Sequence, residues 1–153
     1  MKIDLSRRFG FLLNDVAKRY GERFDLLARE QIGLSRAQCR LLGVLAMNEG
    51  EPLTQVELAA QMGLSTMGVT SLCDRMEATG WIRRETSATD RRAKLIHLEP
   101  TAEEALHAAL GIGDTLQATA LSVLSPAERR QLTELLTKLQ GSLKSMDVAQ
   151  VQA

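Results

Sequence analysis

The chain has 153 residues, of which 44% are hydrophobic and 25% charged, a composition that fits one globular domain able to bury a core. Only 3% of the residues are aromatic and helix formers dominate, which favours a mainly helical fold. Nineteen basic and nineteen acidic side chains cancel, so any attraction for nucleic acid must be local.

The cysteine and histidine content predicts neither a disulfide framework nor a metal site. Cys39, Cys73, His97 and His107 do not form a ligand cluster in the sequence, and we expect no cofactor. The amino-terminal segment lacks the apolar core of a signal peptide, and no apolar run reaches membrane-spanning length. We therefore expect a cytoplasmic protein with reduced thiols and no membrane partner.

Apolar residues recur at helical spacing from Asp4 to about Arg29, which predicts a long amphipathic first helix. Core packing alone explains such a stripe, and a dimer seam or the wall of a ligand crevice are the alternatives. Ser35 then opens a capping box and a second helix that ends at Met47. Cys39 lies on this helix, where we expect a buried, unreactive thiol. The stripe of the first helix comprises Phe9, Leu12, Leu13, Val16, Tyr20, Phe24 and Leu27.

Two short helices joined by a glycine turn follow, which is the plan of a helix-turn-helix. Thr54 opens another capping box, and its helix of about eight residues is predicted to turn Val56, Leu58, Ala59 and Met62 inward. Gly63 supplies the tight turn, Leu64 fills it, and Ser65 caps a helix that runs until Gly80. The inward face of this second helix comprises Val69, Leu72, Cys73 and Met76.

The opposite face of the second helix is small and polar, which suits a major groove about 12 Å wide. Its hydroxyls can donate to phosphates or base edges, Met67 can pack against a thymine methyl group, and Arg75 suits a phosphate or a guanine. A solvated helix face is the alternative, and the basic segment that follows argues against it. The residues predicted to contact DNA here are Ser65, Thr66, Met67, Gly68, Thr70, Ser71 and Arg75.

The sequence after Gly80 predicts a β-hairpin, with a strand from Trp81, a turn over residues 85–90 and a return strand over residues 93–98. Five basic and two acidic side chains lie between Trp81 and Lys94, a local surplus of three positive charges. This is the one marked basic concentration in a neutral sequence.

Arginines at a hairpin tip can enter a narrow minor groove, where the negative potential is greatest. Asp90 lies beside Arg91 and Arg92. Because a carboxylate facing phosphates would be repelled, we expect Asp90 to pair with one of these arginines or with a nearby helix residue and to fix its direction. A solvated charged turn is the alternative.

The carboxy-terminal part predicts two more helices. Thr101 opens a third capping box and a long helix, and Ser125 with Pro126 starts the last one. The terminal helices carry more apolar surface than a winged unit can cover, which implies a second copy related by a two-fold axis. The apolar stripes comprise Leu106, Ala109, Leu110, Gly113, Leu116, Ala120 and Leu124, and then Leu132, Leu135, Leu136, Leu139, Leu143 and Met146.

The order of parts resembles the MarR family of bacterial transcriptional regulators, and most of all its SlyA-like branch. The resemblance rests on GLSRAQ in the second helix, TQVELAAQMGLS in the helix-turn-helix, DRMEATGWIRR after it, and DRRAKLIHL in the hairpin. It implies a mainly α fold with a small β-hairpin wing. Residues 1–33 and 101–147 would form dimerisation helices, residues 34–98 the winged helix-turn-helix, and residues 148–153 a loose tail.

The resemblance also assigns residue roles. Arg91 would be the minor-groove arginine, with Asp90 and Arg92 supporting it or touching phosphate. It further implies a crevice between the dimerisation and DNA-binding parts that binds aromatic carboxylates or other small molecules. The basic residues on helices expected to flank this crevice are Lys18, Arg19, Arg23 and Arg40, and surface solvation explains them equally well.

The sequence therefore predicts a homodimeric, double-stranded-DNA-binding transcriptional regulator that is not an enzyme and responds to a small-molecule effector. It contains no nucleophile-base pair or phosphate-binding glycine loop to support catalysis. The alternative is a winged helix used for protein contact or dimerisation without DNA binding. Such a module would not need a basic hairpin.

Overall fold

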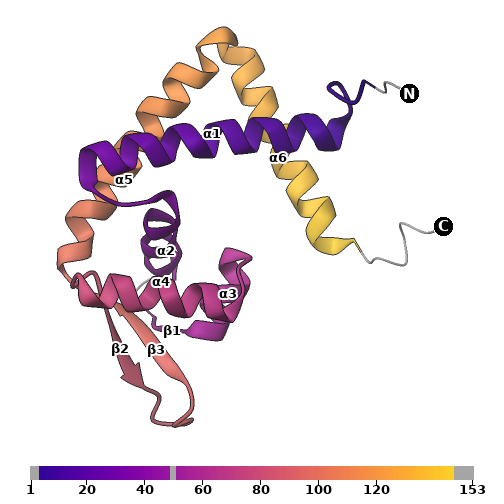
Figure 1. Cartoon of the computed structure of the whole chain (residues 1–153). Coiled ribbons are helices and arrows are strands. Elements are labelled where there is room, and N and C mark those ends of the chain that lie inside the picture. The colour runs from indigo at the N-terminus through magenta and orange to yellow at the C-terminus, as the bar shows by residue number, and fades with distance from the viewer. Residues whose placement is uncertain (1–3, 49–50, 147–153) are drawn as a thin grey trace. The chain divides into compact units, whose positions relative to one another are not determined.

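The computed structural model describes residues 4–48 and 51–146 of the chain. Its helices and strands follow the predicted order (Figure 1). They are α1 (Phe9–Ile32), α2 (Arg36–Met47), β1 (Leu53–Thr54), α3 (Gln55–Met62), α4 (Thr66–Ala78), β2 (Ile82–Thr86), β3 (Lys94–Leu98), α5 (Thr101–Ala120), the 3-10 turn η1 (Leu121–Val123) and α6 (Pro126–Ser145). The predicted fold class, mainly α with a small β-hairpin wing, is confirmed.

A single hydrophobic core holds α2, α3, α4 and the base of the hairpin together. Each of these helices turns a row of apolar side chains toward the others, as their sequence periodicity predicts. The hairpin adds one inward side chain from each strand. The largest fully buried side chains are Leu41, Leu42, Leu58, Met62, Val69, Cys73, Met76, Ile82 and Ile96. The core therefore fixes α4 and the hairpin base as one unit.

Two of the three predicted capping boxes are present, at Ser35 and Thr54, and a further one forms at Ser125, where the sequence predicted the start of the last helix. At the start of α3, the Thr54 hydroxyl oxygen accepts from the Glu57 amide at 3.2 Å, and the Glu57 carboxylate accepts from the Thr54 amide at 2.8 Å. These paired bonds satisfy amides that have no partner inside the helix. The start of each of the helices α2, α3 and α6 is thus set by two residues that lie three positions apart in the sequence.

The third predicted capping box, at Thr101, is wrong. Thr101 is the first residue of α5 rather than the residue before it, and its hydroxyl donates to the Gly80 carbonyl at 2.7 Å. The Ala102 amide is satisfied by the Glu99 carbonyl at 2.9 Å. The side chain of Thr101 therefore ties α5 to the turn between α4 and β2.

Two predicted inward side chains of the helix-turn-helix are exposed instead. Val56 is 66% exposed, whereas Leu58, Ala59 and Met62 are buried as predicted. Since each residue turns the helix by about 100°, Val56 lies about 200° from Leu58 and faces away from the core. Leu64 is 43% exposed and does not fill the turn.

The hairpin is part of a three-stranded antiparallel sheet with the order β1-β3-β2. Ile82 pairs with Leu98, and Thr86 pairs with Lys94. The short strand β1, which the sequence did not predict, adds Leu53 opposite Ile96. A strand of two residues is too short to show alternation, so its pairing depends on the tertiary fold.

Helix α1 begins at Phe9 rather than near Asp4 and continues to Ile32, beyond the predicted end. It ends at Gly33, whose φ of 68° lies in the left-handed region that glycine adopts without steric cost. Its predicted apolar stripe divides into two parts. Phe24 and Leu27 pack partly buried against the core. Phe9, Leu12, Leu13, Val16 and Tyr20 are exposed.

The chain forms two compact units, one ending at Asp114 and one beginning at Thr115. The face of α5 that is buried comprises Ala102, Ala105, Ala109, Ile112 and Leu116, whereas Leu110, which the sequence places on the same apolar stripe, is 60% exposed. Helix α6 has no buried residue. Among the described residues, no helix combines the length and apolarity needed to cross a bilayer. The predicted loose tail, residues 148–153, lies outside the described residues.

Candidate nucleic-acid interface

Helix α4 has one face in the core and one in solvent. Gly63 ends α3 with a φ of 62°, and the Ser65 hydroxyl oxygen then accepts from the Gly68 amide at 3.1 Å to start α4. All four residues predicted to face inward are buried, namely Val69, Leu72, Cys73 and Met76. The rotation of α4 about its axis is therefore fixed by the core.

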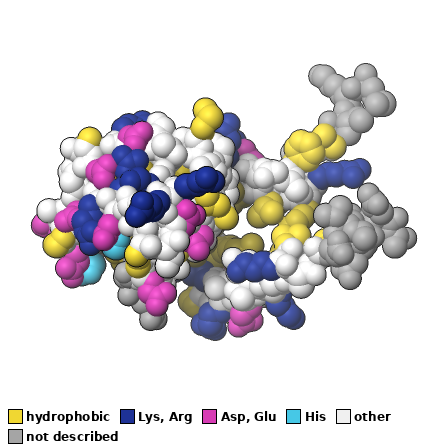
Figure 2. Space-filling model, turned by 90° about the horizontal axis from the view of Figure 1, so that it is seen from below, with side chains coloured by type: hydrophobic (Ala, Val, Ile, Leu, Met, Phe, Trp, Pro, Cys, Tyr) yellow, Lys and Arg dark blue, Asp and Glu magenta, His cyan; other side chains and the backbone are white. Residues whose placement is uncertain are grey.

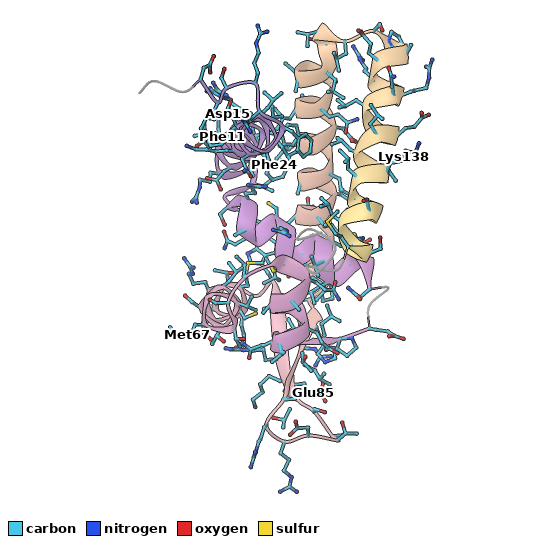
Figure 3. The ribbon with its side chains drawn as sticks, turned by 90° about the vertical axis from the view of Figure 1, so that its right-hand side faces the viewer. Phe11, Asp15, Phe24, Met67, Glu85 and Lys138 are labelled. Carbon is cyan, nitrogen blue, oxygen red and sulfur yellow. The ribbon has the colours of Figure 1, made fainter. Side chains whose placement is uncertain are left out.

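Six of the seven α4 residues predicted to contact DNA are exposed, namely Ser65, Thr66, Met67, Gly68, Ser71 and Arg75. Met67 is 84% exposed and lies on the side of α4 that faces away from the core (Figure 3). The Nε atom of Arg75 donates to the Ser71 carbonyl of its own helix at 3.3 Å. This face is small, polar and open to a macromolecular partner.

Thr70, the seventh predicted residue, is half-buried and already bonded on both sides. Its hydroxyl donates to the Thr66 carbonyl at 2.9 Å and accepts from the Gln55 side-chain amide at 3.0 Å. Thr70 can therefore offer a partner only an acceptor. Gln55, at the start of α3, is a polar residue of this surface that the sequence analysis missed, because its position beside Thr70 depends on the angle between α3 and α4.

The hairpin tip is closed by hydrogen bonds from its own residues. The buried Ser87 hydroxyl oxygen accepts from the Thr89 and Asp90 amides at 3.3 Å each, and the Ser87 amide donates to the Ala93 carbonyl at 3.0 Å. The Asp90 carboxylate accepts from the backbone amide of Arg92 at 2.9 Å. The expected pairing of Asp90 with an arginine side chain is therefore wrong, and Asp90 fixes the backbone of the turn.

The cations of the hairpin divide into paired and unpaired groups. Arg83 and Arg84 are both in ion pairs with carboxylates. Within residues 4–48 and 51–146, Arg91 and Arg92 are in no ion pair, and both are exposed. Basic and acidic side chains mix over the winged region (Figure 2). The local surplus of positive charge is consequently concentrated at the tip, beyond Glu85 in Figure 3.

The four cations predicted to line a ligand crevice are not brought together. Lys18 lines an open cavity of about 820 Å³ between α1, the start of α2, and α4. Arg40 lines another, of about 490 Å³, between α2, α3 and α5. Arg19 and Arg23 line neither cavity, and the Nε atom of Arg19 donates to the Asp15 carboxylate at 2.7 Å.

Arg36 is a cation of the larger cavity that the sequence analysis missed. A side chain at Gly21 of α1 would overlap its guanidinium, so this glycine leaves the space that Arg36 occupies. The Asp25 carboxylate accepts from Arg29 Nε and from the Arg36 amide, each at 2.7 Å, and these bonds lower the pKa of the Asp25 carboxyl. In the sequence, Gly21 inside the long first helix was the signal that another side chain packs closely against that helix. Apolar walls are added by Leu26 and Leu72.

Cys39 and Cys73 are buried free thiols. Burial raises the pKa of each to about 11. Since the thiolate is the reactive form, both thiols are unreactive near neutral pH, as predicted for Cys39. Among the described residues, no three metal-ligating side chains are grouped.

Known proteins share this arrangement of α4 and the hairpin. Residues 32–93, which span α2, the helix-turn-helix and the hairpin tip, match the MarR family. The resemblance found in the sequence motifs is confirmed at this level.

The similarity to MarR-family proteins extends beyond the matched region. The uncharacterized HTH-type transcriptional regulator YfiV of Bacillus subtilis (strain 168) is 28% identical over 115 residues, which are 75% of this chain and 71% of that protein. The crystal structure of the Staphylococcus aureus MepR-DNA complex is 27% identical, with a TM-score of 0.74 over 88% of this chain and 97% of that one. A MarR-family regulator from Rhodococcus sp. RHA1 is 25% identical, with a TM-score of 0.78 over 90% and 96%.

These relatives are transcriptional regulators and not enzymes, which confirms the prediction that the chain is not an enzyme. One of them was crystallised with DNA. The similarity therefore supports a role in DNA-binding regulation.

Proposed function

We propose that the chain is a transcriptional regulator that binds double-stranded DNA as a homodimer on a pseudo-palindromic operator. The observation that carries this proposal is the exposed face of α4 beside a hairpin whose tip arginines form no ion pair among the described residues. Helix α4 enters a major groove, and the hairpin tip reaches the adjacent minor groove. The similarity to the MepR-DNA complex supports DNA as the partner.

The α4 contacts follow from which donors remain free. The Ser65 oxygen is used in the helix cap, so its hydroxyl hydrogen is left for a phosphate or a base. Thr66 and Ser71 have exposed hydroxyls. Met67 offers a methyl group to a thymine, and Arg75 offers its guanidinium to a phosphate or a guanine. Gly68, with no side chain, allows the backbone of α4 to approach the groove closely.

In the hairpin, Arg91 enters the minor groove and the Arg92 guanidinium contacts a phosphate. Asp90 contributes indirectly, because its bond to the Arg92 amide shapes the turn that presents both arginines. Minor-groove readout of this kind favours narrow, A·T-rich sequence beside the major-groove site.

The homodimer is proposed from apolar surface that one chain leaves exposed. Helix α1 exposes Phe9, Phe11 and Leu12 by 51% or more, and α6 exposes Leu135 by 50% and Leu143 by 59%. Contiguous apolar faces of this kind mark interaction sites. We assign residues 1–33 and 101–147 to dimerisation and residues 34–98 to DNA binding within one MarR-type domain.

A small anion is the proposed effector, with an aromatic carboxylate as the first class to test. Lys18 and Arg36 present cations to the larger cavity, whose wall includes Leu72 and Arg75 of α4. Ligand bound there contacts the helix that we place in the major groove, so it can favour a conformation with α4 misplaced. Salicylate titrated against the DNA complex is expected to release the duplex, and no release at millimolar concentrations contradicts this class of effector.

We also propose a branch of the family and a cellular compartment for the chain. We place the chain in the SlyA-like branch on its sequence motifs, and in the cytoplasm, where its DNA target is found. The competing function is a winged helix that makes protein contacts without binding DNA. The unpaired tip arginines favour the DNA-binding function.

Binding to duplexes selected from a random-sequence pool tests the proposal. Affinity should fall steeply as salt rises, because contacted phosphates release counterions. Arg91→Ala should weaken binding by about 1 to 3 kcal/mol, whereas Arg83→Ala, whose guanidinium is paired with Glu85 and Glu99, should change it less. Salt-insensitive binding, or no selected duplex, would favour the interaction module.

A further inference from the structure

Two consecutive arginines on β2 differ in their surroundings. Successive side chains of a strand point to opposite faces, and Arg83 is 54% exposed whereas Arg84 is 22% exposed. Arg83 pairs with Glu85 at 3.0 Å and with Glu99 at 3.3 Å, which lie on the hairpin and directly after it. Arg84 instead points back toward α4.

Arg84 connects the hairpin to α4 through four polar contacts. Its Nε and Nη2 atoms donate to Oε2 of Glu77 at 2.9 and 2.6 Å, and its Nη1 atom pairs with Oδ1 of Asp74 at 2.7 Å. The backbone amide of Arg84 donates to Oε1 of Glu77 at 2.9 Å. Because Asp74 and Glu77 are three residues apart, they lie on one side of α4 and share a single guanidinium.

These contacts pair the positive charge of Arg84 with carboxylates of the protein itself. The Arg84 side chain is the main cause that lowers the pKa of the Glu77 carboxyl, and Glu77 is the main cause that raises the pKa of Arg84. A planar guanidinium held by several carboxylate oxygens is fixed in direction as well as in charge. Arg84 is therefore not free for a phosphate, and it offsets negative charge on the helix proposed to enter DNA.

Among the described residues, Arg84 is also the outermost hydrogen-bonded link between the hairpin and a helix, and Lys94, farther out, adds only a charge interaction with Glu77. Nearer the hairpin base, the Trp81 amide donates to the Met76 carbonyl at 3.0 Å. Beyond Arg84, the hydrogen bonds join hairpin residues to each other, as when Lys94 Nζ donates to the Thr86 hydroxyl oxygen at 2.7 Å. Loss of the Arg84 contacts would leave the base attached and free the outer hairpin to change its angle.

We propose that Arg84 is a positioning residue that sets the angle of the hairpin to α4 and thereby couples the minor-groove contact to the major-groove contact, a role that rests on the function proposed above. Both contacts must meet neighbouring grooves of one duplex at the same time. A wrong hairpin angle removes the tip contact and leaves the α4 contact in place. Arg84 thus acts on DNA through Arg91 without touching DNA itself.

The test uses the full chain and a duplex that the wild-type protein selects from a random-sequence pool. Arg84→Gln and the matched control Arg83→Gln each remove one charge from adjacent positions of β2. Each is measured alone and together with Arg91→Ala. We expect Arg84→Gln to weaken binding by about tenfold or more, and Arg91→Ala then to weaken it by less than about threefold further. In the wild-type and Arg83→Gln proteins, Arg91→Ala should keep its full effect.

Footprinting gives a second measurement that a general loss of stability does not reproduce. With Arg84→Gln, protection from hydroxyl radicals should be lost at the minor-groove site, while protection of guanine N7 from dimethyl sulfate in the major groove should remain. Arg83→Gln should retain both protections.

A full effect of Arg91→Ala in the Arg84→Gln protein, or equal weakening by Arg84→Gln and Arg83→Gln, would overturn the positioning role. If Arg84→Gln does not fold, the double variant Asp74→Asn with Glu77→Gln removes both ion pairs of Arg84 with almost no change of shape. It must then show the same reduced effect of Arg91→Ala, and a full effect overturns the role. If the wild-type protein selects no duplex, the proposed function itself fails, which is a different result.

Discussion

Helices α4 and α6 are both amphipathic, yet only α4 buries its apolar side chains within the chain. Its Val69 and Met76 are completely buried, whereas no residue of α6 is buried and Leu135 remains 50% exposed. Burying apolar surface is worth about 25 cal/mol per Å², so an exposed apolar face favours association. The comparison indicates that the apolar side chains of the winged region are covered within one chain, whereas those of α6 are left for the second copy in the proposed homodimer.

The largest effect is expected when charge is introduced into the apolar face of α6. The double variant Leu135→Asp with Leu139→Asp should be monomeric, because two carboxylates cannot be buried unpaired in an apolar seam. Affinity for a duplex with two half-sites should then fall by about a hundredfold or more, since each half-site is bound separately. Sedimentation equilibrium gives the mass, and a gel shift gives the affinity.

The matched control is Thr137→Asp, which places a carboxylate on the exposed side of the same helix, opposite the apolar stripe. It should leave both mass and affinity unchanged. A Leu135→Asp, Leu139→Asp protein that stays dimeric would show that α6 is not the seam.

A smaller effect is expected when one leucine is truncated in the buried core and one on an exposed apolar face. Leu42 is fully buried, and Leu12 of α1 is 51% exposed. In the monomeric double-Asp protein, Leu42→Ala should lower the free energy of unfolding by about 2 to 5 kcal/mol. Leu12→Ala should change it by less than about 0.5 kcal/mol, as for other surface substitutions. Urea unfolding measures both.

In the wild-type protein, Leu12→Ala should additionally weaken the proposed dimer, so its effect should depend on protein concentration. Equal losses for Leu42→Ala and Leu12→Ala in the monomer would mean that α1 is packed within one chain. The distinction between apolar side chains covered within one chain and those left exposed would then not hold.

The smallest expected effect concerns the start of α3, inside the winged region. Bonds from the Thr54 amide and hydroxyl lower the pKa of the Glu57 carboxyl. A carboxyl with a lower pKa in the folded state adds stability above its ordinary pKa and loses it as pH falls through the folded value. Wild-type stability should therefore decrease as pH falls below about 4.5, the ordinary value, and Glu57→Gln should make this part of the profile flatter.

Thermal melts from pH 7 to 3 measure the difference between the two proteins, and Glu51→Gln, an exposed glutamate outside the capping boxes, is the control. Parallel profiles for wild type and Glu57→Gln would show that the capping box does not contribute to acid sensitivity.

Features that depend on neighbouring residues could be predicted from the sequence. The capping boxes predicted at Ser35 and Thr54 and the buried row of α4 are local patterns, and all are present. Val56 was misplaced because α3 has only eight residues, too few to define a face by counting apolar positions. The hairpin was recognised because its charges are close together in the sequence.

Features that depend on the angle between elements could not be predicted. The sequence around Thr101 has the pattern of a helix cap, yet the Thr101 hydroxyl donates a hydrogen bond to the Gly80 carbonyl instead. Asp90 lies beside two arginines, yet a backbone amide is nearer its carboxylate. The Arg84 contacts join residues on two elements and leave no periodic pattern. The i, i+3 carboxylates Asp74 and Glu77 were the one available hint.

The self-closed tip of the hairpin has a consequence for how such proteins diversify. Its backbone bonds come from Ser87, Asp90 and Ala93, and none requires the side chains at Ala88 or Arg91. Replacements at those two positions therefore keep the loop geometry while altering what it offers to DNA. Under the proposed function, single substitutions at the tip can therefore change the operator preference of this chain with no compensating change in the scaffold.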